Sequence, residues 1–292
     1  MEVKVAATAG FCYGVSRAVS TVYEQLKKCP DKKIFTYGPI VHNDSVVSEL
    51  NDRGVRVIND REELSGMAGS GELTDSICVI RAHGIGNDEM ELLKQVKGLE
   101  IVDATCPFVT KIHTIVEEHH KLGEQIIVTG DRRHPEVMGI IGCVSNDAIV
   151  ISEPEDAKLL SIAPNQKICL VSQTTFNARK FEDIVEILKN KMYDIRIVNT
   201  ICNATQRRQS EAAALSRECD AMIVIGGRNS SNTAKLFDIC RSSCRATYYI
   251  QCLDDLRKVA IRNSVRCIGI TAGASTPKTI IEEVLNYVRT EF

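Results

Sequence analysis

Short apolar stretches alternate with segments of amphipathic pattern along the sequence. The first stretch, residues 3–8, precedes a segment from Tyr13 whose apolar residues recur every three or four positions, a spacing that predicts a helix. Eleven further stretches with strand character lie at residues 33–38, 55–59, 76–84, 100–106, 125–130, 148–152, 167–175, 194–202, 221–227, 246–251 and 265–273. Strands that alternate with helices favour parallel sheets with right-handed crossovers, so the sequence predicts an α/β fold.

Polar residues at the predicted strand ends repeat at nearly one interval. The first strand of each repeat leads to Cys12, Cys106 and Cys202, which are 94 and 96 positions apart. Two more series are in phase with it: His42, His134 and Ser230 follow the second strands, and His83, Thr174 and Ser275 follow the fourth. An internal repeat of this length predicts three copies of one module.

The three predicted modules cover residues 1–99, 100–193 and 194–292. In parallel α/β sheets, ligands bind beyond the carboxyl ends of the strands, which is where every residue of the three series lies. A pseudo-threefold arrangement of the modules would direct these residues towards one central cavity. The sequence therefore predicts three pseudo-symmetric α/β domains, with mainly parallel sheets, around a shared site.

The composition is that of a globular protein and excludes several classes. Hydrophobic residues make up 44% and charged residues 25% of the 292 positions, and 36 basic residues face 38 acidic ones, for a formal charge of −2. A dedicated nucleic-acid-binding protein usually has a basic surplus. No apolar run approaches the ~20 residues that span a bilayer, and the first residues resemble neither a secretory signal nor a transit peptide. We therefore expect a cytoplasmic protein with neither nucleic acid nor membrane as a partner.

Cysteine is the unusual component, with 12 residues and no C-x-x-C pair. In a cytoplasmic protein, cysteines are more often metal ligands or catalytic groups than disulfide partners. Cys78, Cys169 and Cys267 lie inside apolar strands. A free cysteine there behaves as a small hydrophobic residue, so we expect these three in the core.

Cys12, Cys106 and Cys202 stand at equivalent positions, each just before a predicted helix. A helix N-terminus favours the thiolate form that a metal requires. Three thiolates suit zinc with one open position. They also suit a four-iron iron–sulfur cluster in which one iron lacks a protein thiolate. Three buried cysteines in similar surroundings are the structural alternative.

Three histidines and several hydroxyl or amide residues form a second candidate group: His42, His83, His134, Ser230, Asn232 and Ser275. Together with helix N-termini and glycine-rich stretches, such groups can hold a diphosphate without a metal. Glu136, in the first turn after His134, is either a helix-dipole partner or a proton donor beside a metal. Thr174 is a candidate for positioning water or relaying that proton.

The predicted helix after Cys106 has three further histidines, His113, His119 and His120. We expect them on its solvent-exposed face, without a role in the site.

Nine segments together resemble one family, the 4-hydroxy-3-methylbut-2-enyl diphosphate reductases of the methylerythritol phosphate route to isoprenoids. The segments are GFCYGVSRA, GPIVHN, RAHGIG, VDATCPFVTK, HPEVMGIIG, SQTT, TICNATQRRQ, IGGRNSSNT and TAGASTP, which span residues 10–277. Each segment alone is a weak signal, whereas the full set is highly specific. The resemblance implies three α/β domains around a central iron–sulfur site, in agreement with the repeat.

The resemblance also implies a role for each matching residue. Cys12, Cys106 and Cys202 correspond to the ligands of a [4Fe-4S] cluster. The catalytic group corresponds to Glu136, as the acid near the substrate hydroxyl with Thr174 beside it, and to His134. The substrate-binding residues correspond to His42, His83, His134, Thr174, Ser230, Ser231, Asn232 and Ser275.

The implied reaction is the reductive dehydroxylation of (E)-4-hydroxy-3-methylbut-2-enyl diphosphate to isopentenyl and dimethylallyl diphosphate. The hydroxyl binds the open iron, two electrons enter through the cluster, and a proton delivered through Glu136 lets water leave. A reduced ferredoxin or flavodoxin is the expected donor, because no flavin or nicotinamide motif is evident. Two rival functions are a non-redox enzyme or sensor for a phosphorylated ligand, with inert cysteines, and a zinc-stabilised binding protein without turnover.

Overall fold

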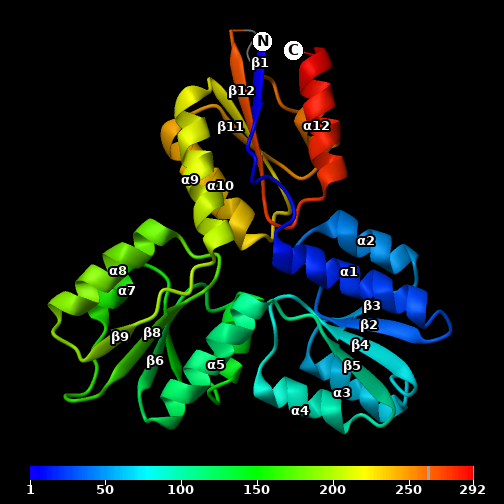
Figure 1. The fold of residues 1–292 in the computed structure, drawn as a ribbon, viewed down its shortest axis with the longest axis vertical. Helices are drawn as coiled ribbons and strands as arrows, with labels where there is room; N and C mark the ends of the chain where they lie inside the picture. The colour runs from blue at the N-terminus through cyan, green and yellow to red at the C-terminus, as the bar shows by residue number, and fades with distance from the viewer. Residues whose placement is uncertain (262–263, 292) are drawn as a thin grey trace. The chain divides into compact units, whose positions relative to one another are not determined.

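The computed structural model describes residues 1–261 and 264–291 as strands that alternate with helices (Figure 1). The strands are β1 (Glu2–Val5), β2 (Lys33–Tyr37), β3 (Arg56–Ile58), β4 (Ser76–Ile80), β5 (Leu99–Asp103), β6 (Gln125–Thr129), β7 (Ala148–Ile151), β8 (Ile168–Ser172), β9 (Ile195–Ile197), β10 (Ala221–Ile225), β11 (Thr247–Ile250) and β12 (Cys267–Ala272). The helices are α1 (Tyr13–Lys28), α2 (Asp44–Asp52), α3 (Arg61–Ser70), α4 (Asn87–Gln95), α5 (Pro107–Lys121), α6 (Pro135–Gly142), α7 (Pro154–Leu159), α8 (Ala178–Asn190), α9 (Asn203–Glu218), α10 (Ser231–Ser243), α11 (Leu253–Arg257) and α12 (Lys278–Glu291).

The strands form three parallel four-stranded sheets, so the predicted α/β class with parallel sheets is confirmed. We call them sheet A (order β1-β12-β10-β11), sheet B (β3-β2-β4-β5) and sheet C (β7-β6-β8-β9). The first strand of each predicted repeat pairs with the repeat before it: β5 with β4, β9 with β8, and β1 with β12 of the last repeat. The same strand order thus recurs in each sheet. The domain ranges 1–99, 100–193 and 194–292 stay predictions.

The chain forms two compact units. Unit 1 comprises Met1–Ser16, Val41–Glu49 and Asn203–Phe292, and unit 2 comprises Arg17–Ile40 and Leu50–Cys202. Sheet A belongs to unit 1, and sheets B and C belong to unit 2. Each unit therefore contains some of the predicted site residues.

Sheet C is covered by helices on both faces, which explains why its central strands are apolar throughout. α5 and α6 cover one face with a cluster that includes Ile112, Val137 and Cys169. α7 and α8 cover the other face with a cluster that includes Leu170 and Phe181. Cys169 and Leu170 are neighbours in β8 and point to opposite faces, because side chains alternate along a strand. Burial of one large aliphatic or aromatic side chain of this kind stabilises the fold by about 1.5–3 kcal/mol.

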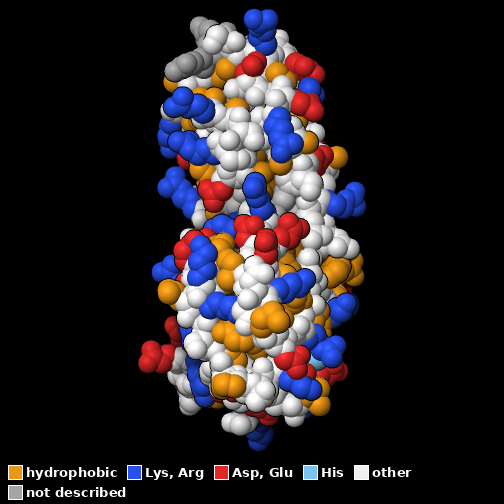
Figure 2. Space-filling view, turned by 90° about the vertical axis from the view of Figure 1, so that its left-hand side faces the viewer, with side chains coloured by type: hydrophobic (Ala, Val, Ile, Leu, Met, Phe, Trp, Pro, Cys, Tyr) orange, Lys and Arg blue, Asp and Glu red, His pale blue; other side chains and the backbone are white. Residues whose placement is uncertain are grey.

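The surface has mixed charge. Figure 2 shows lysine and arginine side chains interspersed with aspartate and glutamate on one face, in line with the formal charge of −2. Within residues 1–261 and 264–291, no helix is both long and apolar enough to cross a membrane.

Candidate functional site

In unit 2, Cys106 stands at the point where the chain leaves sheet B and α5 begins. It is the N-cap of α5, and the first helical residue is Pro107, whose fixed φ suits the first turn of a helix. The Cys106 N–H donates to the Ala82 carbonyl at 2.9 Å, which ties the start of α5 to the segment that follows β4. That segment continues directly into His83. The Cys106 thiol and the His83 imidazole therefore start from neighbouring stretches of backbone.

The imidazole rings of His83 and His134 are in edge-to-face contact, with centroids 5.3 Å apart and an interplanar angle of 85°. His134 is the N-cap of α6, and its Nδ1 accepts the Glu136 N–H at 3.2 Å. A ring nitrogen that accepts a hydrogen bond has no proton of its own. The proton of the neutral His134 ring is therefore on Nε2.

Glu136 is a buried acidic residue that accepts two hydrogen bonds from one partner. It is 2% exposed, and it accepts the Thr174 N–H at 2.5 Å through Oε1 and the Thr174 O–H at 2.7 Å through Oε2. A buried carboxyl group needs such donors, because removal from water penalises an unpartnered polar group. The Thr174 carbonyl in turn accepts the Cys202 N–H at 3.0 Å. Direct contacts thus join His83, His134, Glu136, Thr174 and Cys202 within unit 2.

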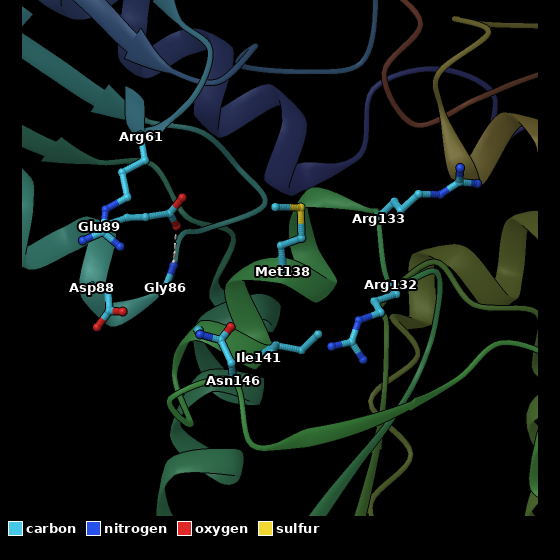
Figure 3. A pocket seen from close by; sticks show the side chains of 10 residues that line it. Arg61, Gly86, Asp88, Glu89, Arg132, Arg133, Met138, Ile141 and Asn146 are labelled. Atoms are coloured by element: carbon cyan, nitrogen blue, oxygen red, sulfur yellow. Dashed lines mark hydrogen bonds between the residues drawn. The ribbon is translucent and has the colours of Figure 1, made fainter. Parts of the chain in front are cut away.

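An open cavity of about 500 Å³ lies beside α6 in unit 2 (Figure 3). Its wall combines Asp88 and Glu89 of α4 with Arg132 and Arg133, which precede α6. Figure 3 shows Asp88 and Glu89, together with Arg61, on one side of Met138, and Arg132 and Arg133 on the other. Among the residues that line this cavity, none belongs to the predicted site. We therefore assign the cavity no part in it.

In unit 1, Cys12 and His42 both contact the loop that follows β12. The Cys12 N–H donates to the Ala274 carbonyl at 3.2 Å, and the Ser275 hydroxyl donates to the His42 carbonyl at 3.0 Å. Gly227 packs against the same carbonyl: a Cβ at this position would lie 2.5 Å from the His42 oxygen, so only glycine fits without a shift. Close packing therefore holds these loops together.

α10 begins with three of the predicted polar residues. Ser230 is its N-cap, and the Ser230 hydroxyl oxygen accepts the Thr233 N–H at 3.3 Å. The Ser231 hydroxyl oxygen accepts a hydrogen bond from the Lys235 ammonium at 2.9 Å. Asn232 is 4% exposed, and neither atom of its side-chain amide has a hydrogen-bond partner in the described part of the chain. Such a buried amide costs about 1–3 kcal/mol, which a polar ligand at the start of α10 would offset.

The predicted ligand cysteines differ from the predicted core cysteines in exposure. Cys12, Cys106 and Cys202 are partly exposed, and they directly precede α1, α5 and α9. The cysteines expected in the core are buried, as predicted: Cys78, Cys169 and Cys267. Partly exposed thiols at helix N-termini, each fixed by a backbone hydrogen bond, are a donor set that fits an iron–sulfur cluster.

A family model described as LytB protein matches residues 3–289 of this sequence. The chain belongs to the LytB protein family. A relative from Caldanaerobacter subterraneus subsp. tengcongensis, named 4-hydroxy-3-methylbut-2-enyl diphosphate reductase, is 46% identical over 99% of this chain and 97% of its own length. A relative of the same name from Clostridioides difficile is 40% identical over 99% of both chains.

Solved structures share the fold of this LytB family member. The E-1-hydroxy-2-methyl-but-2-enyl-4-diphosphate reductase from Plasmodium falciparum matches with a TM-score of 0.90 and 32% identity, over 99% of this chain and 88% of that one. A structure of (E)-4-hydroxy-3-methyl-but-2-enyl diphosphate reductase, described as the terminal enzyme of the non-mevalonate pathway, matches with a TM-score of 0.66 and 35% identity over 99% of both. The family resemblance predicted from the nine segments is therefore confirmed.

Two histidines of this LytB chain lie elsewhere than predicted. The side chain of His119 is only 15% exposed, and Nε2 of His113 is buried, so the expected solvent-exposed face was wrong for both. Burial lowers the pKa of His113, because it disfavours the charged ring. His113 packs under a turn at Gly84, where a Cβ would be 2.9 Å from its Cε1. A signal was available, since His113 shares a helix face with the buried Val109 and Val116.

Proposed function

We propose that this chain catalyses the reductive dehydroxylation of (E)-4-hydroxy-3-methylbut-2-enyl diphosphate to isopentenyl diphosphate and dimethylallyl diphosphate, the last step of the methylerythritol phosphate pathway. Membership of the LytB family over residues 3–289 supports this reaction, because relatives across the full length are named as the reductase. The observation that carries the proposal is the buried Glu136–Thr174 pair, which contacts Cys202 on one side and His134 on the other.

Three cysteines are the proposed ligands of a [4Fe-4S] cluster. Cys12, Cys106 and Cys202 would each supply one thiolate, and their partial exposure at helix N-termini supports this role. When bound, such a cluster supplies electrons and one iron, free of protein ligands, that can act as a Lewis acid. The other cysteines have no part in this proposal.

The proposed diphosphate ligands are residues that follow strands or begin helices. Asn232 supports this pocket most directly, since its buried amide has no partner in residues 1–261 and 264–291. Backbone N–H groups at the start of α10 add partial positive charge, which favours phosphate oxygens. The full proposed set is His42, His83, His134, Thr174, Ser230, Ser231, Asn232 and Ser275.

Glu136 is the proposed proton donor at the substrate hydroxyl. The overall reaction takes up two electrons and two protons and releases one water, so it requires a group that delivers protons. Thr174 holds both carboxyl oxygens of Glu136 through its N–H and its hydroxyl, which orients the acid. His134 accepts the Glu136 N–H through Nδ1, so its Nε2–H is the donor that we assign to the substrate.

The proposed electron donor is a reduced ferredoxin or flavodoxin, and we propose that the reaction takes place in the cytoplasm. The sequence has no recognisable flavin or nicotinamide motif, so the electrons come from another protein.

An anaerobic assay tests this function. Protein with a reconstituted cluster is mixed with a chemical reductant and (E)-4-hydroxy-3-methylbut-2-enyl diphosphate, and the products are identified by mass spectrometry. We expect isopentenyl and dimethylallyl diphosphate to form faster than with a Cys106→Ser control. Binding of the diphosphate without turnover would identify a non-redox protein for a phosphorylated ligand and overturn the proposal.

A further inference from the structure

Three side chains of metal-ligating type meet at the amino-terminal end of sheet C, the end opposite to Glu136 and Thr174. His119 belongs to the last turn of α5, Glu124 directly precedes β6, and Cys169 is the second residue of β8. One ligand atom from each of these three residues lies within 4.8 Å of the other two. His119 Nδ1 and Glu124 Oε2 are 2.8 Å apart.

We propose that His119, Glu124 and Cys169 form a zinc-binding site. The side chains of His119 and Glu124 are 15% and 11% exposed, and Cys169 is 0% exposed, so the ligand atoms are sheltered from water. Thiolate, imidazole and carboxylate are the ligand types that zinc uses in proteins, whereas calcium and magnesium prefer oxygen ligands alone. With three protein ligands, the fourth tetrahedral position holds a water molecule.

Backbone hydrogen bonds fix the three residues independently of any metal. The Glu124 N–H donates to the His119 carbonyl at 3.1 Å, so the two ligands are tied through the end of α5. Ile126, two residues after Glu124, pairs in register with Cys169 in the β6–β8 ladder. Ligands on rigid elements lose little freedom when a metal binds, which favours a preorganised site.

The electrostatics of this place also suit a cation. His119 lies at the C-terminal end of α5, where the helix dipole concentrates partial negative charge. Zinc replaces the thiol proton of Cys169, forms a Zn–S bond and releases the proton to solvent. The resulting thiolate and the Glu124 carboxylate together balance the two positive charges of the ion.

A cavity of about 290 Å³ opens beside Glu124, one of the three proposed ligands. Lys167 and Arg196 line it together with Asp194. The proposed zinc complex has no net charge, so the positive charges of Lys167 and Arg196 do not repel it as a whole. The negative charge of Asp194 offsets one of these two positive charges. Burial, and after it the Glu124 charge, raises the pKa of Cys169 to about 11, so the metal-free site holds a protonated thiol at neutral pH.

Zinc loading of the cluster-containing protein tests the site. The protein is purified without oxygen and dialysed against zinc, and bound zinc is measured by mass spectrometry. Zinc-edge X-ray absorption then identifies the ligands without interference from iron. We expect one zinc per chain, with one sulfur at ~2.3 Å and nitrogen or oxygen ligands at ~2.0–2.2 Å.

Paired variants decide between this site and other thiols. His119→Ala and Cys169→Ser should each weaken zinc binding by at least about tenfold. His120→Ala and Cys143→Ser are matched controls, since one is the neighbouring histidine and the other lies in the same buried cluster as Cys169. Both controls should bind zinc like the wild type.

Three results would overturn the proposal. The first is that the protein binds no stoichiometric zinc. The second is a zinc shell with several sulfur ligands, which would place the zinc on the cluster cysteines. The third is unchanged zinc binding in folded His119→Ala protein. Because His119 retains some solvent exposure, its substitution is the deciding one if Cys169→Ser fails to fold. None of these readouts depends on reductase activity.

Discussion

The two ends of sheet C hold similar residue types in opposite chemical settings. At the carboxyl end, Glu136 accepts the N–H and the hydroxyl of Thr174. At the amino end, Glu124 contacts Nδ1 of His119 at 2.8 Å, and Cys169 completes the group. Both glutamates are largely buried, yet the first is held by donors of the loop after β8 and the second by an imidazole.

The direction of the chain explains this difference. Crossovers between parallel strands place helix N-termini at the carboxyl ends of a sheet and helix C-termini at the amino ends. α5, which connects β5 of sheet B to β6 of sheet C, has Cys106 as its N-cap and His119 in its last turn. N–H groups favour thiolates and phosphates at the first end, and carbonyl groups favour cations at the second. Acid, imidazole and sulfur therefore have different preferred partners at the two ends.

Removal of a proposed cluster cysteine should have the largest effect on bound iron and turnover, whereas removal of Cys169 should have little effect on bound iron. Cys106→Ser deletes a proposed ligand, so we expect the protein to lose bound iron. Its turnover should fall to the background rate of the assay. Cys169→Ser, at the amino end of sheet C, should retain the iron content and the visible absorption of the wild type. Iron and acid-labile sulfide analysis measures both variants. Equal loss of iron in the two would contradict the assignment.

Cys169 should react with thiol reagents far more slowly than Cys106 and Cys202, because it is buried and they are partly exposed. Burial raises the pKa of Cys169 to about 11, so only about 0.1% of it is thiolate at pH 8. In native, metal-free protein, iodoacetamide should modify the partly exposed Cys106 and Cys202 at pH 8 and leave Cys169 intact. Its modification should rise about tenfold per pH unit up to pH 11.

Peptide mass spectrometry with and without the cluster completes this test. Cluster assembly should protect Cys106 and Cys202, whereas the exposed Cys252 should react in both states. Fast modification of Cys169 at pH 8 would contradict its burial. Continued modification of Cys106 in iron-loaded protein would remove it from the ligand set.

The sequence predicts the ends of strands well, because an apolar run stops where the chain leaves the core. Cys106, His83 and Thr174 were located in this way. The contact between Glu136 and Thr174 could not be located in this way, since these residues are 38 positions apart and meet because β6 and β8 are neighbours in sheet C. Only the family resemblance implied that Thr174 lies beside Glu136. A repeat identifies equivalent positions, but it does not identify which loops touch.

The order of strands in each sheet, and the side chains that pack beside a given residue, could not be predicted from the sequence pattern for a related reason. The pairing of β1 with β12 joins the two ends of the sequence, and no periodicity within a strand specifies its partner. For Cys169 the apolar pattern predicted burial correctly. It did not indicate that His119 and Glu124 lie beside the thiol, because their positions depend on how α5 packs on the sheet.

Glu136→Gln should reduce turnover by about 10²-fold, because the amide cannot release a proton to the substrate. The cluster absorption and the binding of the diphosphate should not change, since an amide of the same size still accepts the Thr174 N–H through its oxygen and donates to the Thr174 hydroxyl oxygen through its NH2 group. Glu155→Gln, with a side chain that is 71% exposed on α7, is the matched control and should retain wild-type turnover. Steady-state assays with a chemical reductant measure these rates. Wild-type turnover in Glu136→Gln would remove it from the role of proton donor.

The Thr174 hydroxyl should have a smaller effect than the acid that it orients. Thr174→Val removes the donor to Oε2 of Glu136 and retains the backbone N–H to Oε1, so we expect turnover to fall roughly tenfold. Thr174→Ser retains the hydroxyl and should recover most of the activity. If serine is as slow as valine, the lost methyl group is responsible and Thr174 acts through packing. The hydrogen-bonded pair would then not distinguish the carboxyl end of sheet C from the amino end.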